Sequence, residues 1–267
     1  MGKEAILGLF RALILVAFIL AIPVALITTN VRIAISEKAT YDYAVRHYGA
    51  EQASGINEAE LIRANGEIRE YLVNQRPGAL SPTVSNAAGE DEALFSVRET
   101  AHMADVRDLV GTLATVQLLA VALTLVLGVA LLVLWPPRAL AAAALYGSVL
   151  TAIVLGLASV LALSGFDAAW SQFHVIAFTN DFWELDPATD HLIQMYPEDF
   201  WFDVTMLIGI ATLAQALVIS TASALYLVVT APAPEPRVLP EPRPELPRPE
   251  HLRNRIPPPD PRHYTGG

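Results

Sequence analysis

Four long apolar runs constrain this chain more than any other feature. They cover residues 5–28, 109–135, 139–164 and 204–229, and each exceeds the ~20 residues that a helix needs to cross the hydrocarbon core of a bilayer. Inside lipid only helices and closed barrels satisfy all backbone hydrogen bonds, and uninterrupted apolar runs of this length are helical. The sequence therefore predicts an all-α fold, an integral membrane four-helix bundle.

Composition excludes several classes of protein. Hydrophobic residues make up 54% of the 267 residues and charged residues only 16%, whereas about 25% of an ordinary soluble domain is charged. The net charge of −10 argues against a nucleic-acid partner. There is no cysteine, which excludes disulfides, thiolate metal ligands and a cysteine nucleophile. We expect neither a soluble enzyme nor a secreted module.

Charge in the connections predicts the orientation of the bundle. The turn at residues 136–138 (Pro-Pro-Arg) is basic, whereas residues 166–203 contain eight acidic residues and no Lys or Arg. By the positive-inside rule, both termini and the basic turn are expected in the cytoplasm, and the two long loops outside. The first apolar run is longer than the 7–15-residue apolar core of a signal peptide, which indicates an uncleaved anchor.

These features divide the chain into spans, loops and a tail. The tail holds twelve of the nineteen prolines and alternates Arg with Glu, so we expect it to be disordered. The expected parts are a first transmembrane helix (1–28), an extracytoplasmic loop domain (29–108), transmembrane helices 2 (109–135) and 3 (139–164), an extracytoplasmic site-forming loop (165–203), transmembrane helix 4 (204–230) and the proline-rich cytoplasmic tail (231–267). Together the two loops would form a helical cap.

The first loop carries candidate site residues close to the membrane. A helix is predicted from Asp91 onward that continues into the second span, and on it Arg98, His102 and Asp105 share one face because their spacing is i, i+4, i+7. His102 then lies about 10 Å above the apolar boundary at Leu109, at the height of lipid headgroups. Earlier in the loop, a capping pattern predicts a helix near residues 58–74, and residues 78–89 are expected to be a turn-rich linker.

The second loop is richer in aromatic and polar residues than a simple connection requires. Helices can be joined by two to eight residues, and an aromatic belt at the membrane surface explains only residues 200–202. We therefore expect a re-entrant or site-forming element here. The polar residues that the belt leaves unexplained are His174, Thr179, Asn180, Asp181, Glu184, Asp186, Asp190 and His191.

Several segments together resemble one known family, the lipoprotein intramolecular transacylases, which are membrane proteins with four helices. The resembling segments are residues 30–32 with 41–43, 95–106, 173–183 (FHVIAFTNDFW), 186–190 (DPATD) and 195–200 (MYPEDF). Their order, their spacing and their placement between four apolar runs carry the resemblance, which covers residues 1 to about 229.

The resemblance implies an acyltransferase of the bacterial plasma membrane. Family members act on lipoproteins whose N-terminal cysteine carries an S-linked diacylglyceryl group. They move the sn-2 acyl chain to the free amine of that cysteine, which gives the lyso-form lipoprotein. The partners implied are diacylglyceryl-modified lipoproteins and membrane lipid, with an extracytoplasmic active site. In that family the histidines that match His102 and His174 are regarded as central.

The residues fit this chemistry. Aminolysis of an ester within one molecule needs a base for the amine proton and an acid for the leaving glyceryl oxygen, and histidine can serve as either. We expect His102 and His174 to be catalytic, in an order the sequence leaves open, with no cofactor and no metal. The supporting candidates are Asp105 and Asp181 as orienting residues, Asn180 or Arg98 at the oxyanion or glyceryl oxygens, and Trp183, Asp186 and Asp190 at the substrate, the last two alternatively as turn builders.

Two other functions fit the same residues. A metal-dependent lipid hydrolase would use His102, Asp105, His174, Asp181 and Asp190 as ligands, although the sequence has no H-E-x-x-H motif. A non-enzymatic membrane scaffold or sensor would bind a partner through the outside loops and signal through the tail. Metal analysis tests the first alternative, and full function of histidine-to-alanine variants would favour the second.

Overall fold

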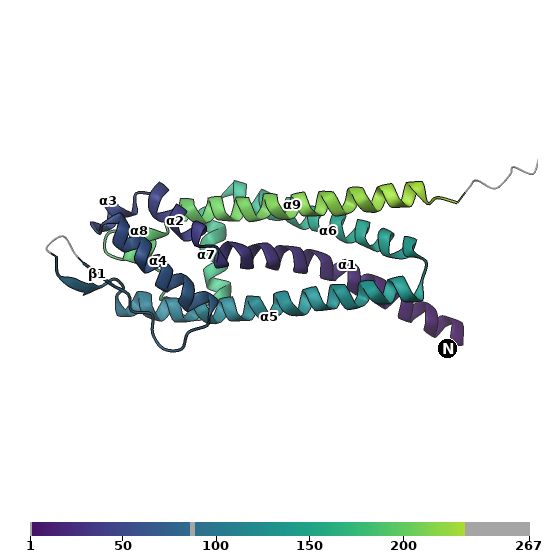
Figure 1. Ribbon diagram of the computed structural model, residues 1–267, viewed down its shortest axis with the longest axis horizontal. Coiled ribbons are helices and arrows are strands. Elements are labelled where there is room, and N and C mark those ends of the chain that lie inside the picture. Colours follow the sequence, from purple (N-terminus) through teal and green to yellow (C-terminus); the bar gives the residue numbers. More distant parts are fainter. Residues whose placement is uncertain (1, 86–88, 233–267) are drawn as a thin grey trace, which may run out of the picture. The chain divides into compact units, whose positions relative to one another are not determined.

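The computed structural model describes residues 2–85 and 89–232, and within them the chain forms nine helices and one two-stranded sheet. As predicted, the fold is all-α and has four helices long and apolar enough to cross a membrane. They are α1 (Lys3–Ser36), α5 (Val97–Leu134), α6 (Pro137–Ser164) and α9 (Glu198–Val229), which run side by side in Figure 1. The expected disordered tail lies, from residue 233 on, outside the described residues.

Helix α1 is the helix that holds the bundle together, because it packs against α5, α6 and α9. Its inner face contributes to a buried apolar cluster of Ile14, Phe18, Ile22, Leu131 and Ala143. Gly147 of α6 allows close approach, since a Cβ added there would lie 3.2 Å from the backbone oxygen of Ile19. Small residues of this kind permit helices to approach in lipid. The outward faces of the bundle are lined with exposed large apolar side chains, as expected of helices that contact lipid.

A polar network joins α1 to α9 inside this apolar bundle. Asn30 Nδ2 donates to Thr212 Oγ1 at 3.1 Å and to Gln215 Oε1 at 2.8 Å, and Gln215 Nε2 donates back to Asn30 Oδ1 at 3.2 Å. Hydrogen bonds between helices replace those that water cannot supply in hydrocarbon. The network therefore fixes the register of α1 against α9.

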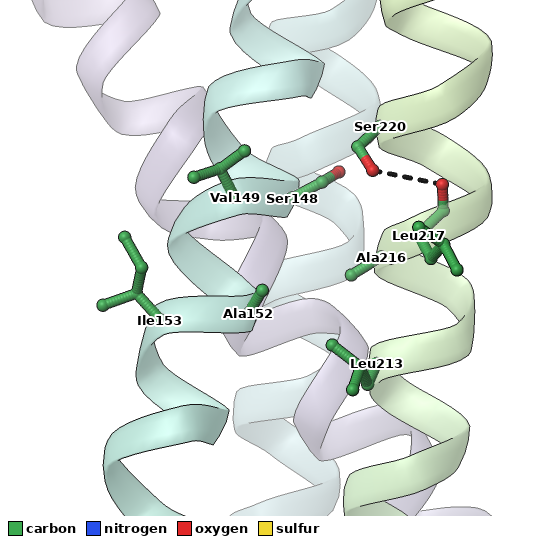
Figure 2. Close-up of a pocket in the computed structure, with 8 residues that line it drawn as sticks. All are labelled: Ser148, Val149, Ala152, Ile153, Leu213, Ala216, Leu217 and Ser220. Atoms are coloured by element: carbon green, nitrogen blue, oxygen red, sulfur yellow. Dashed lines mark hydrogen bonds between the residues drawn. The ribbon is translucent and has the colours of Figure 1, made fainter.

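A groove with a volume of about 310 Å³ runs between α6 and α9 (Figure 2). It is lined by Ser148, Val149, Ala152, Ile153, Leu213, Ala216, Leu217 and Ser220. Its serines bond to their own helices, with Ser220 Oγ donating to the Leu217 carbonyl at 3.1 Å and Ser148 Oγ to the Ala144 carbonyl at 2.8 Å. The groove contains none of the predicted site residues.

The two ends of the bundle differ in the chain segments that lie there. At one end lie the start of α1, the α5–α6 turn and the end of α9 (Figure 1). There, Arg138 donates to the Leu227 carbonyl and to Thr230 Oγ1, both at 2.7 Å, and the Arg11 guanidinium lies 5.7 Å from the Trp135 ring centroid. The two long connections between spans, from α1 to α5 and from α6 to α9, gather at the other end.

These connections form short helices and a hairpin, which we call the end domain. Its elements are α2 (Lys38–His47), α3 (Ala50–Ser54), α4 (Glu58–Val73), β1 (Thr83–Ser85), β2 (Asp91–Ala93), α7 (Phe166–Ala177) and α8 (His191–Met195). Leu61, Ile68, Met195 and other side chains form a shared buried core. Within it, Asn65 Nδ2 donates to the Tyr41 carbonyl at 2.8 Å and accepts the Tyr196 hydroxyl through Oδ1 at 2.5 Å.

Two local predictions about the first connection are wrong, although the helix near residues 58–74 is found as α4. The expected linker contains β1, which pairs antiparallel with β2 in the register Thr83↔Ala93. Residues 91–93 are therefore strand and not the start of a helix. Helix α5 begins only at Val97, because Ser96 accepts from the Glu99 amide and the Glu99 carboxylate accepts from the Ser96 amide, a capping box.

Candidate functional site

Two buried histidines lie close together, one on the long helix α5 and the other on α7 of the end domain. His102 lies on the first turns of α5 and His174 near the end of α7, and the side chains are 6% and 7% exposed. Their ring centroids are 6.0 Å apart, with an interplanar angle of 36°. The structure thus brings together the two residues that the sequence analysis selected as catalytic.

Aromatic side chains surround this pair. The Trp183 ring stacks on His174 at a centroid distance of 5.0 Å, and Trp170 meets His174 edge-on at 4.7 Å. Phe178 packs edge-on against His102 at 5.1 Å. These rings exclude water from the imidazoles, and a dry setting strengthens any electrostatic interaction made there.

The hydrogen bond of His174 identifies its tautomer. His174 Nδ1 lies 2.8 Å from the Trp170 carbonyl oxygen. A carbonyl oxygen can only accept, so Nδ1 carries the hydrogen and Nε2 presents a lone pair. Burial lowers the pKa of His174, and the bond to Trp170 opposes this shift. His174 is therefore neutral at pH 7, with Nε2 able to accept a proton.

His102 has a different environment. It lies on the part of α5 that precedes the apolar run beginning at Leu109, and its Nδ1 is buried without a hydrogen-bond partner among the described residues. Burial and, secondarily, the charge of His174 lower the pKa of His102 to about 4, against the opposing effect of Asp105. His102 is therefore also neutral at pH 7, and no hydrogen bond at Nδ1 fixes its tautomer within the described part of the chain.

Beside the histidines, hydrogen bonds link α5 to the loop that follows α7. Asn180 Nδ2 donates to Asp105 Oδ2 at 2.9 Å, and Asn180 Oδ1 accepts from the Phe182 amide at 3.1 Å. The Asn180 carbonyl accepts from Trp183 Nε1 at 3.0 Å. Asp105 thus bonds to Asn180 and not to a histidine, and its effect is to hold the segment whose tryptophan stacks on His174.

The remaining predicted site residues lie in the loop after α7 or contact it. Arg98 donates to the backbone carbonyl of Asp181 at 3.5 Å, so this contact does not use the Asp181 carboxylate. Asp190 Oδ2 accepts from the Asp186 amide at 2.7 Å, and Asp186 Oδ1 from the Ala188 amide at 2.9 Å, which is turn geometry. In the described part of the chain, no three His, Asp or Glu side chains are grouped closely enough to hold a metal ion.

Sequence reasoning did not select Glu99, which lies one turn before His102. Its side chain is 1% exposed, and Oε1 accepts from the Leu192 amide at 2.7 Å while Oε2 accepts from the Ser96 amide at 2.7 Å. Glu99 therefore ties the start of α8 to the start of α5. The S-x-x-E spacing of Ser96 and Glu99 could have predicted the bond to Ser96, but not the bond to Leu192.

Comparison with known proteins gives a consistent result. Residues 16–201 match the family model described as lipoprotein intramolecular transacylase Lit. No curated protein matches.

Solved structures of Lit from Bacillus cereus, a membrane-integral lipoprotein intramolecular transacylase determined in meso, have the same fold. One matches with a TM-score of 0.71 and 21% identity, covering 83% of this chain and 97% of that chain. Two variants with one histidine replaced match with TM-scores of 0.69 and 20% identity. The arginine variant covers 85% of this chain and 96% of its own, and the alanine variant 85% and 98%.

Proposed function

Because the chain belongs to the lipoprotein intramolecular transacylase family and is therefore a membrane-integral acyltransferase, we propose that it acts on bacterial lipoproteins with an S-diacylglyceryl cysteine. It moves the sn-2 acyl chain to the α-amine of that cysteine and leaves the lyso-form lipoprotein. Partners are the lipoprotein and membrane lipid. The pair of buried neutral histidines is the observation that carries the proposal.

The proposed location is the bacterial plasma membrane, with both termini in the cytoplasm. The basic turn at residues 136–138 and the acidic connection at 166–203 support this orientation by the positive-inside rule. The end domain and the histidines would then face the extracytoplasmic side. An N-terminal lipidated cysteine is held at that surface by its acyl chains, so amine and ester reach the site together.

In the proposed mechanism, His174 is the base. Its Nε2 takes a proton from the amine as the nitrogen bonds to the ester carbonyl carbon. His102 donates its own ring proton to the glyceryl oxygen as the carbon–oxygen bond breaks, and the proton taken up by His174 then returns to His102, so that both imidazoles end neutral. The products are an amide and a free glyceryl hydroxyl, and no proton is consumed overall. Holding both reacting groups in one molecule contributes a further large factor through effective molarity.

Neighbouring residues have supporting roles in this proposal. Asn180, fixed by Asp105, would offer its second N–H to the oxyanion of the tetrahedral intermediate. Trp183 would line the glyceryl group, because its ring stacks on His174. Arg98 and Asp181, Asp186 and Asp190 would hold the loop that carries these groups, through the contacts described above.

Tandem mass spectrometry of a synthetic diacylglyceryl-cysteine lipopeptide tests the function. Purified protein should leave the mass unchanged while one acyl chain moves to the amine. His102→Ala and His174→Ala should each slow conversion by about 10²–10⁴-fold, the usual contribution of acid–base catalysis. His47→Ala is the matched control, because His47 stacks on Tyr43 outside the site at a centroid distance of 4.2 Å.

Three results would contradict the proposal. Release of free fatty acid would point to a hydrolase, and a requirement for metal would favour the metal-dependent form of it. Full conversion by both alanine variants would remove the histidines from the mechanism. No conversion by folded protein in detergent and in liposomes would favour a scaffold or sensor.

A further inference from the structure

An arginine lies on α1 at the level of the apolar runs. The helix continues past the predicted span end at Thr28 to Ser36, so Arg32 faces α5, and its Nη1 donates to Gln117 Oε1 at 2.8 Å. Gln117 is about two turns inside the apolar run that starts at Leu109. Arg32 is exposed, and an arginine near the end of an apolar run can extend to the lipid headgroups, where it can bind a ligand.

A second arginine contacts the same end of α1. Arg69 of α4 donates through Nε to the carbonyl oxygen of Ser36 at 2.5 Å. Neither Arg32 nor Arg69 forms an ion pair with a carboxylate in the described part of the chain. Glu37, which follows Ser36, is exposed and forms no ion pair there either. By contrast, Arg46, Arg63, Arg76 and Arg107 in this part of the protein each pair with an Asp or Glu.

A small cavity of about 40 Å³ lies between α1, α4 and α5 beside these arginines. Its lining consists of Arg32, Ile35, Ser36, Val73, Gln75, Val110, Leu113 and Ala114. One buried water needs a cavity of roughly 10–15 Å³. The cavity therefore suits a compact polar group and is too small for an acyl chain.

The polar wall of the cavity is built with some strain. Gln75 has a positive φ of 51°, and its Nε2 donates to the Leu72 carbonyl at 2.7 Å and the Arg107 carbonyl at 3.0 Å. A Cβ on Gly111 would lie 2.5 Å from Gln75 Oε1, so the glycine makes room for this amide. A non-glycine residue in the left-handed region persists where surrounding contacts enforce it, often at ligand sites.

We propose that this cavity binds the phosphate group of a membrane phospholipid. Guanidinium groups bind phosphate oxygens through paired hydrogen bonds. Arg32 lines the cavity, and Arg69 is bonded to the carbonyl oxygen of the lining residue Ser36. The α5 apolar run is longer than the ~30 Å hydrocarbon core, since residues 109–134 span about 39 Å, so its first turns lie among headgroups. The acyl chains would continue along Val110, Leu113 and Ala114. This inference does not depend on the acyl-transfer chemistry.

Native mass spectrometry in mild detergent tests the site. Titration with phosphatidylglycerol and with a diacylglycerol that has the same acyl chains distinguishes binding through the phosphate from binding through the acyl chains. We expect phosphatidylglycerol to bind at least tenfold tighter, and Arg32→Gln/Arg69→Gln to lose at least tenfold of that affinity. Arg46→Gln, which removes an arginine from the exposed pair with Glu58, should bind as the wild type does.

A second variant and a competition with inorganic phosphate complete the test. Ala114→Phe fills the cavity without altering either arginine and should also abolish preferential binding, which covers the case that the double variant fails to fold. Equal binding of both lipids by the wild type, or unchanged binding by Ala114→Phe and by a folded double variant, would overturn the proposal. Displacement of phosphatidylglycerol by millimolar inorganic phosphate alone would assign the site to free phosphate and not to lipid.

Discussion

The buried carboxylate of Glu99 should contribute strongly to the stability of the site. It accepts one hydrogen bond from its own helix start, at the Ser96 amide, and one from α8, at the Leu192 amide, both at 2.7 Å. Glu99→Gln preserves the volume but turns one acceptor into a donor. One of the two backbone amides must then face an NH₂ group and lose its partner.

The expected loss follows from these contacts. A hydrogen bond to a charged group contributes about 1.5–3 kcal/mol, and leaving a buried N–H unpaired costs about 1–3 kcal/mol. With Glu99 only 1% exposed, water cannot replace the missing partner. Glu99→Gln should therefore lower the free energy of unfolding by about 2–5 kcal/mol, and the α8 amides should exchange hydrogen faster.

The assay is denaturant unfolding in mild detergent combined with hydrogen exchange at Leu192. Glu67→Gln is the matched control, because Glu67 forms an exposed pair with Arg63 at 2.8 Å, and such pairs contribute about 0–1 kcal/mol. If Glu99→Gln and Glu67→Gln unfold alike and the Leu192 amide keeps its protection, the assignment of Glu99 as the link between α5 and α8 is wrong.

Three further measurements test other parts of the structure. His102 has a pKa near 6.5 in the unfolded state and about 4 in the folded state, so the free energy of unfolding should fall as the pH drops through this window, by about 3 kcal/mol at most. Thermal melting temperatures of the wild type and of His102→Phe should therefore diverge below pH 6.5. Parallel curves of melting temperature against pH would contradict this. Gly147→Ala should destabilise the bundle by about 1–3 kcal/mol, because its Cβ would lie 2.5 Å from a side chain of α1. Gly156→Ala is the control, since a Cβ there would have no atom within 4 Å and should not destabilise the bundle. Equal melting temperatures of the two variants would refute the close contact. Gly111→Ala should cost about 1–3 kcal/mol alone and little in a Gln75→Gly background, and an additive double variant would show that the two positions do not interact.

The bundle could be predicted because its signal is local. Each span is a continuous apolar run, so its helical nature follows without knowledge of its neighbours. The position where α1 ends could not be predicted in this way. Residues after Thr28 are polar enough to resemble a loop, but contacts with α9 and α5 keep them helical, as the bonds of Asn30 and Arg32 illustrate. The pairing of β1 with β2 was missed for the same reason, since each strand depends on a partner outside its own segment.

The candidate site divides in a similar way. His102 was identified from family resemblance and from its height above the second apolar run, and His174 from family resemblance and from the unexplained polar residues of the second loop. Their surroundings depend on contacts between distant parts of the chain. The bond of Asn180 to Asp105 crosses 75 positions and that of Leu192 to Glu99 crosses 93. Helical spacing alone pointed Asp105 toward His102, and only the folded chain reveals the competing amide.

The continuity of α5 gives this protein a mechanical property. The helix has 38 residues without a break, a rod about 57 Å long, and His102 lies near its start while the rest of the helix packs among apolar helices. His174 belongs to α7, which runs across the long helices in Figure 1. A helix longer than the bilayer is thick accommodates the mismatch by tilting. Glu99 and Asp105 bond the start of α5 to α8 and to the loop after α7, so we expect tilt of α5 in the bilayer to carry the surroundings of His174 along with His102.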